Sequence, residues 1–173
     1  PGTDKLIFCK QYNKAQFTNW LNAHGGISAT DNCKEVFWEY SFDKIPEYGC
    51  DTSIVAFTAK DHCGNETIKY LNFIIRDTSK PILVQNASHS LLRCSSTAKD
   101  SLKKWLISHA GIEAIDSCSL LSWTNNFNGD SSSLRIMVDF IAEDQCGNRL
   151  VVPAIFEQLD APDTSYNTSY NCH

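Results

Sequence analysis

The chain contains an internal repeat, and this feature limits its fold more than any other. Residues 9–38 recur without a gap as residues 94–123, at an offset of 85 (94 − 9). The offset then becomes 83, and the run Asp-His-Cys-Gly-Asn at 61–65 recurs as Asp-Gln-Cys-Gly-Asn at 144–148. Self-similarity of this kind is the signature of tandem structural units. We therefore expect two modules, residues 1–80 and 81–162, followed by a C-terminal tail, residues 163–173.

Each repeat combines one short helix with several strands. Three apolar residues per repeat share one face of the predicted helix: Phe17, Trp20 and Leu21, then Leu102, Trp105 and Leu106. The segments 36–40, 53–59 and 67–75 are strand-like and bounded by turn residues. Short strands at this spacing are typical of a β-sandwich. Its interior is expected to be filled by Phe42, Ile54, Phe57, Ile68, Leu71 and Phe73.

The eight cysteines indicate disulfides rather than a metal site. Their number is even, their separations are wide, and no Cys-x-x-Cys pair occurs. Disulfides persist in oxidising compartments, and modules of this size gain stability from them. The economical assignment pairs the first two cysteines of each repeat, which share a 24-residue span. The four predicted disulfides are Cys9–Cys33, Cys50–Cys63, Cys94–Cys118 and Cys146–Cys172.

The motifs of the repeat resemble a known family. The first repeat contains Cys-x14-His-Gly-Gly-Ile-x-Ala-x-Asp-Asn-Cys, then Asp-His-Cys-Gly-Asn, then Asp-Thr-Ser-Lys-Pro. Over residues 3–162 this pattern is similar to the HYR-like repeats, immunoglobulin-like modules arrayed on bacterial surface adhesins, especially in Bacteroidetes. The second repeat lacks the third cysteine and closes with Asp160-Ala161-Pro162. The resemblance implies tandem Ig-like modules, a location outside the cell or on its surface, and a spacer or adhesive role without catalytic residues.

Charge and hydropathy exclude two classes of partner. The formal net charge is −5, and no cluster of Lys or Arg offers the basic face that nucleic acid requires. No apolar run approaches the roughly 18 residues that span a bilayer. We therefore expect a secreted protein that neither binds nucleic acid nor inserts into a membrane.

The residues that recur in both copies indicate structure rather than catalysis. His24 and His109 each precede the glycine that ends the predicted helix, where a histidine can bond the last carbonyl groups. No nucleophile or acid accompanies both histidines, so we expect no enzyme activity. Four tryptophans are expected to pack in the core, with sugar stacking as the alternative: Trp20, Trp38, Trp105 and Trp123.

We expect no cofactor, with calcium as the alternative. Three aspartates recur in both copies near strand ends and the junction of the modules, where hard oxygen ligands would suit Ca²⁺. The candidate ligands are Asp31, Asp61, Asp77, Asp116, Asp144 and Asp160. No EF-hand spacing accompanies them, and single aspartates also cap turns. The simpler interpretation is therefore that they cap turns.

Several positions are candidates for glycosylation. Asn65, Asn86 and Asn167 begin Asn-x-Ser/Thr sequons. The family resemblance also implies O-glycosylation at Ser or Thr after Asp, for which the candidates are Thr52, Thr78, Ser101 and Thr164. The competing interpretation of the Asp-Ser/Thr pairs is a set of turn caps.

Two functions fit these observations. The first is a structural building block of a cell-surface fibre whose copies assemble head to tail. The tail, with Tyr166 and Tyr170 and no charge after Asp163 except the final His173, is a candidate donor strand for the next copy. The second is an adhesin module that binds glycan or protein on another surface.

Overall fold

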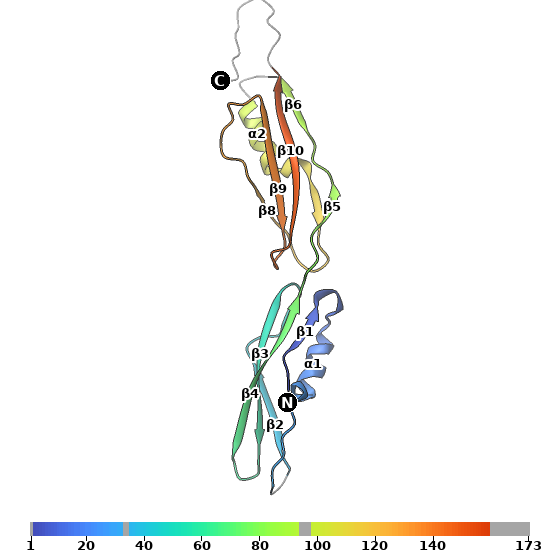
Figure 1. Cartoon of the computed structure of the whole chain (residues 1–173), viewed down its shortest axis with the longest axis vertical. Helices are drawn as coiled ribbons and strands as arrows, with labels where there is room; N and C mark the ends of the chain where they lie inside the picture. Colours follow the sequence, from blue (N-terminus) through green and yellow to red (C-terminus); the bar gives the residue numbers. More distant parts are fainter. Residues whose placement is uncertain (1, 33–34, 94–97, 160–173) are drawn as a thin grey trace, which may run out of the picture. The chain divides into compact units, whose positions relative to one another are not determined.

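The computed structural model describes residues 2–32, 35–93 and 98–159. The chain divides into two compact units, Pro1–Thr78 with Ser117–Ser119, and Ser79–Asp116 with Leu120–His173. Each unit is mostly β with one short α-helix, which confirms the predicted fold class (Figure 1). No described helix is long and apolar enough to span a membrane.

The first unit contains one four-stranded sheet with a helix against its inner face. Its elements are β1 (Lys5–Phe8), η1 (Cys9–Gln11), α1 (Lys14–Asn22), η2 (His24–Gly26), β2 (Phe37–Phe42), β3 (Asp51–Lys60) and β4 (Glu66–Arg76). The strand order is β1-β4-β3-β2, with β1 parallel to β4 and the other pairs antiparallel. Figure 1 shows α1 alongside this sheet.

Local sequence explains where α1 begins and which face it buries. Asn13 caps the helix by accepting from the Gln16 backbone N–H, and the Gln16 side chain accepts from the Asn13 N–H in return. This capping box satisfies two backbone donors that a helix start otherwise leaves free. One turn later Phe17 and Leu21 are buried, and Phe17 meets Phe73 of β4 edge to face at 5.0 Å.

The core of the first unit is built from alternate residues of the long strands. Phe57 and Phe73 are fully buried, whereas Ile54 and Ile68 are 50% and 46% exposed. The expectation that Ile54 and Ile68 fill the interior was therefore wrong. Successive side chains of a strand point to opposite faces, and these two isoleucines lie on the face away from α1. The layer opposite the inner face consists of α1 with η1 and η2.

The second unit repeats this plan and adds a small second sheet. Its elements are β5 (Ile82–Gln85), β6 (Ser90–Arg93), α2 (Ala98–Ile107), η3 (His109–Gly111), β7 (Glu113–Ile115), β8 (Ser122–Asn125), β9 (Arg135–Glu143) and β10 (Arg149–Leu159). The main sheet has the order β6-β10-β9-β8, and β5 pairs with β7 in a separate two-stranded sheet. Phe140 and Phe156 are fully buried, and Trp105 of α2 packs against both at 5.2 and 5.5 Å.

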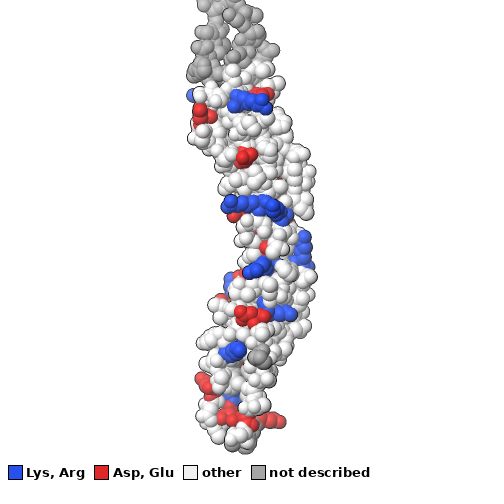
Figure 2. Space-filling model, viewed as in Figure 1, with Lys and Arg blue, Asp and Glu red and all other residues white. Residues whose placement is uncertain are grey.

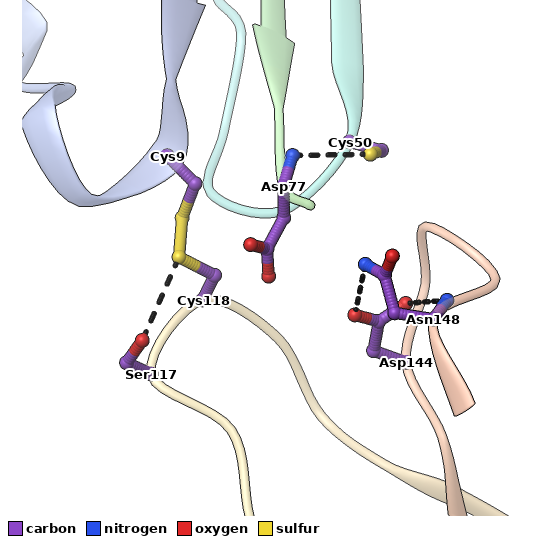
Figure 3. Close-up of a disulfide and its surroundings, with 7 residues drawn as sticks. All are labelled: Cys9, Cys50, Asp77, Ser117, Cys118, Asp144 and Asn148. Atoms are coloured by element: carbon purple, nitrogen blue, oxygen red, sulfur yellow. Dashed lines mark hydrogen bonds between the residues drawn. A yellow bond between two sulfur atoms is a disulfide. The ribbon is translucent and has the colours of Figure 1, made fainter. Parts of the chain in front are cut away.

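A disulfide joins Cys9 to Cys118, with Cα atoms 6.0 Å apart (Figure 3). Cys118 is buried in the core cluster of the first unit, and the neighbouring Ser117 hydroxyl donates to its sulfur. The predicted pairs Cys9–Cys33 and Cys94–Cys118 were therefore wrong, and Cys33 and Cys94 lie outside the described residues. The repeat establishes that Cys9 and Cys94 are equivalent, but equivalence does not fix connectivity.

The predicted pair Cys50–Cys63 was also wrong. Among the described cysteines Cys63 is free and exposed, whereas Cys50 is disulfide-bonded. Cys50 precedes β3 and Cys63 follows it, so a fully extended ten-residue strand separates them. At about 3.3 Å per residue this strand is roughly 30 Å long, far beyond the roughly 7 Å between Cα atoms that a disulfide tolerates.

The fourth predicted pair is not tested. Cys146 is disulfide-bonded, and Cys172 lies outside the described residues. The pair Cys146–Cys172 therefore stays a prediction.

Candidate functional site

The first unit has a groove of about 290 Å³ on the inner face of its sheet, and this groove is the candidate site. One wall is formed by residues 27–31 together with Val36. The floor contains Trp38, Ala59, Thr67 and Lys69. Pockets that hold ligands begin near this size, at roughly 300 Å³.

Strand register places the floor residues side by side. Trp38, Ala59 and Thr67 form one row across β2, β3 and β4, and Phe57 and Lys69 belong to the next row. Because paired residues of a sheet share a face, these side chains all lie on the inner side. The Trp38 ring is held by His24, whose ring is stacked on it at 4.5 Å with 10° between the planes.

Two polar groups of the floor, the Thr67 hydroxyl and the Lys69 ammonium, make no hydrogen bond or ion pair within 4 Å in the described part of the chain. The charge of Lys69 contributes, after the hydrogen bonds from Asn72, to the lowered pKa of Asp4. At the rim, by contrast, Lys60 Nζ lies 2.7 Å from Glu39 and 3.7 Å from Glu66. The hydrogen bond to Glu39 is the main cause that raises the pKa of Lys60. The groove therefore presents an indole, a hydroxyl and an ammonium to a ligand.

The second unit fills the equivalent position with apolar side chains. At the offset of 83, Thr67 corresponds to Leu150 and Lys69 to Val152. Val152 is 6% exposed and Leu150 packs against the same core cluster, as does Leu83 of β5. Ala142, the counterpart of the half-buried Ala59, is fully buried. The two repeats thus share a fold but differ at this site.

The Asp-x-Cys-Gly-Asn motif forms the turn between the last two strands of each sheet. The Asp61 carboxylate accepts from the backbone N–H groups of Cys63 and Asn65 and from the Asn65 side chain. Asp144 makes the same three bonds with Cys146 and Asn148, and Figure 3 shows the two with Asn148. The Asn65 side-chain bond is the main cause that lowers the pKa of Asp61. The motif is therefore a side-chain-stabilised turn.

These turns bear on the calcium candidates. Both carboxylate oxygens of Asp61 and of Asp144 accept hydrogen bonds within these turns, which agrees with the interpretation of the two residues as turn caps. Asp31 lines the groove together with Asp61. Asp77 is buried just after β4, with its N–H directed at the Cys50 sulfur at 3.5 Å (Figure 3). Asp116 is half-buried and Asp160 lies outside the described residues.

The repeated histidines support aromatic packing. His24 and His109 begin η2 and η3 with left-handed φ values of 52° and 51°, and their rings lie flat against Trp38 and Trp123. This arrangement differs from the expected bond to the last helix carbonyls. Burial lowers the pKa of His109.

The tryptophans pack as expected. Trp105 belongs to the core of the second unit, and the other three pack against the core of their own unit. This confirms the core-packing interpretation. Trp38 also lines the groove, a role that its place in mid-strand did not indicate.

The structure places most of the glycosylation candidates on the surface. Asn65, Asn86, Thr52 and Thr78 are exposed, and Ser101 is half-buried in α2. The Asn65 side-chain amide donates to Asp61 at 2.6 Å, so a glycan there would compete with the turn. Asn167 and Thr164 lie outside the described residues. Glycosylation at these positions stays a prediction.

The charged residues are mixed rather than segregated. Figure 2 shows Lys and Arg interspersed with Asp and Glu on the visible face. The described ion pairs on strands, such as Arg149 with Glu143 at 2.9 Å, join opposite charges within one sheet. On the described part of this face no continuous basic stripe of the kind that nucleic acid requires is visible.

Comparisons with known proteins give only distant structural neighbours. No family model and no curated protein sequence matches the chain. The extracellular cadherin domains 1–4 of protocadherin gamma B7 match with a TM-score of 0.34 and 12% identity, over 75% of this chain and 42% of that one. Four extracellular domains of Drosophila N-cadherin match with a TM-score of 0.32 and 10% identity, over 92% and 48%.

A bacterial protein is among the neighbours as well. A Ca²⁺-stabilised adhesin that helps an Antarctic bacterium bind ice matches with a TM-score of 0.27 and 10% identity, over 64% of this chain and 32% of that one. This chain therefore spans less than half of each of these three structures. Two of them are cadherin domains and the third is an adhesin, but likeness at these scores carries no inference about this chain. The resemblance to HYR-like repeats stays a prediction.

Proposed function

We propose that the protein is a non-enzymatic extracellular building block whose copies join head to tail in a surface fibre. The observation that carries this proposal is the bond between Cys9 and Cys118. It links the first cysteine of the first repeat to the second cysteine of the second repeat, and therefore staples consecutive repeats rather than closing each one. Disulfides of this kind also fit a protein outside the cell.

The same connectivity can continue between copies. By the offset of 85, Cys94 is the equivalent of Cys9, and Cys33 is the equivalent of Cys118. The pair that repeats the observed bond is therefore Cys94 of one copy with Cys33 of the next. Its formation removes two protons and two electrons from the two thiols, and a thiol oxidase is a suitable acceptor. A head-to-tail contact of this kind produces a filament unless the rotation closes a ring.

Non-reducing electrophoresis of protein whose free thiols have been blocked tests the proposal. We expect a ladder of multiples of the 19.4 kDa chain, which collapses to one band on reduction. Cys94→Ser should abolish the ladder, and Cys63→Ser is the matched control because Cys63 is exposed and free in the described part of the chain. A ladder that survives Cys94→Ser and disappears with Cys63→Ser would show that copies are linked through Cys63, and this result would contradict the proposed link through Cys94.

A second candidate is an adhesin module, favoured by the presence of Trp38 beside unpaired polar groups in the groove. Indole rings pack against the C–H faces of sugars, and hydroxyl and ammonium groups bond to sugar hydroxyls. Binding of the reduced monomer to immobilised glycans tests it. Retention that is lost with Trp38→Ala would favour this function over the structural one.

A further inference from the structure

We propose that the groove of the first unit binds residues 162–169 of a second copy as an added β-strand along residues 28–30. The proposal rests on the head-to-tail assembly proposed above and names the surface that accepts the neighbour.

The second unit provides the pattern for this strand. There β5 pairs with β7, with Ile82 opposite Ile115 and Leu83 opposite Ala114. Leu83 packs against the core cluster, whereas Ile82 and Val84 on either side are 63% and 57% exposed. The strand thus adds one inward side chain and a row of backbone hydrogen bonds.

The first unit has a segment equivalent to the acceptor β7, and no strand within the described part of the chain is paired with it. At the offset of 85, residues 28–30 are the equivalents of β7, and they form one wall of the groove. Among the described residues no strand pairs with them and no backbone hydrogen bond engages them. A segment without a strand partner beside an open groove is a surface suited to strand addition, in which the backbone supplies affinity and the groove supplies specificity.

The sequence that follows the second repeat identifies the occupant. Residues 81–88, which contain β5, read Pro-Ile-Leu-Val-Gln-Asn-Ala-Ser, and residues 162–169 read Pro-Asp-Thr-Ser-Tyr-Asn-Thr-Ser. The two segments share Pro, Asn and Ser at their first, sixth and eighth positions. Each follows the aspartate that closes its repeat, Asp77 or Asp160. Residues 162–169 therefore hold, after the second repeat, the place that the β5 segment holds after the first.

The polarity of the groove floor and the polarity of the strand proposed to pack on it change together between the two units. Leu83 enters a cluster that contains Val152 and Leu150, both apolar. In the first unit those two positions are Lys69 and Thr67, and the residue at the Leu83 position of the tail is Thr164. A polar strand thus meets a polar floor, and an apolar strand meets an apolar floor. This pairing favours the tail over the apolar linker 81–88 as the ligand of the first unit.

Peptide binding to the full chain tests the assignment. The probe is a fluorescent peptide of residues 161–173 with Cys172→Ser. It is added to the Cys94→Ser protein, in which the proposed disulfide cannot join copies, at a concentration low enough for the tails of the protein itself to dissociate. We expect saturable binding that a scrambled peptide does not reproduce. Ala29→Pro removes a backbone donor from the acceptor edge and should weaken binding by about tenfold, which corresponds to the roughly 1.4 kcal/mol of one lost hydrogen bond and its packing.

A variant in which the floor residues of the groove are exchanged distinguishes a loss of specific contacts from misfolding. Thr67→Leu with Lys69→Val gives the groove of the first unit the floor residues of the second. We expect this variant to bind the tail peptide more weakly and a peptide of residues 81–88 more tightly. A variant that binds the second peptide more tightly has kept its fold. The proposal is overturned if the tail peptide does not bind, or if neither Ala29→Pro nor the exchanged floor changes its affinity. A Cys94-dependent ladder without peptide binding would support the disulfide link between copies and overturn the strand addition. Peptide binding without a ladder would support the strand addition and overturn the disulfide link.

Discussion

The ring of His24 lies parallel to that of Trp38, 4.5 Å away, and the second unit repeats the pair as His109 and Trp123 at 4.6 Å. In both units the histidine follows the helix in a left-handed conformation that turns its ring onto an edge strand. The stack therefore connects the end of the helix to the outermost strand of the sheet. It is a structural element that both copies of the repeat share.

His109 should make the second unit sensitive to mild acid. Burial lowers its pKa below the ordinary 6.5, so the unfolded chain takes up a proton before the folded chain does. The stability that depends on a neutral His109 is therefore fully present above pH 6.5 and is lost as the pH drops from 6.5 through the lowered pKa. His109→Asn, which tolerates a positive φ, should remove this dependence and cost about 0.5–1.5 kcal/mol of stacking. Urea unfolding between pH 7.5 and 5 measures both effects, and an unchanged pH profile in the variant would contradict the assignment.

The Cys9–Cys118 bond should contribute strongly to the stability of the first unit. It closes a loop of 109 residues in sequence separation, for which the chain-entropy model gives about 4.7 kcal/mol. We expect Cys9→Ser with Cys118→Ser to lower the free energy of unfolding by several kcal/mol in that model. Cys63→Ser is the control and should leave the denaturation midpoint unchanged. Equal stability of the double variant and the wild type would show that the bond is not formed in solution.

Gly25 should not tolerate a side chain, although the second unit has alanine at the same position. A Cβ at Gly25 would lie 2.5 Å from Leu71 Cδ1 and 3.0 Å from Phe57 Cε2, at a φ of +62°. Gly25→Ala should therefore destabilise the first unit by about 1–3 kcal/mol through overpacking. The control is Ala110→Gly, which relieves a φ of 56° but loses a buried methyl, two effects of about 1 kcal/mol that oppose each other. Calorimetric midpoints of the two variants should differ clearly, and equal shifts would contradict this account.

The Asp144 turn should be important for the second unit. Asp144 is 5% exposed, and its carboxylate accepts three hydrogen bonds across the β9–β10 turn. Asp144→Ala leaves these donors unsatisfied, and we expect a loss of about 1–3 kcal/mol. Asp144→Asn retains one acceptor oxygen and should lose less. The order of the two variants in chemical denaturation checks the role, and a stabilising effect of Asp144→Ala would point to a ligand site instead.

The repeat allowed much of the fold to be predicted. The offsets of 85 and 83 correctly indicated equivalent helices, equivalent core-packed tryptophans and equivalent turns at Asp61 and Asp144. Disulfide connectivity did not follow, because it depends on which segments meet in space. The length of β3 between Cys50 and Cys63 nevertheless excludes one predicted pair on strand geometry alone.

The groove was not predicted, and its signal is a difference between the copies. Trp38 and Phe57 have aromatic equivalents in the second repeat, so both appeared as ordinary core residues. Only the exchange of Leu150 and Val152 for Thr67 and Lys69 marks the site. That exchange is visible in the sequence at the offset of 83. Its meaning depends on β5, which pairs with residues 113–115 in the second unit and has no described counterpart in the first.

Peptide mapping of a mixture of isotopically labelled and unlabelled protein tests the head-to-tail link most directly. The two forms are mixed in equal amounts while reduced, oxidised together, treated to block remaining thiols and digested without reduction. The account predicts a peptide pair joining Cys94 to Cys33 in which half of the molecules carry one labelled and one unlabelled partner. Cys94 joined to Cys33 without any mixed pairs would place the bond within one chain, and that result would contradict the assembly of copies head to tail.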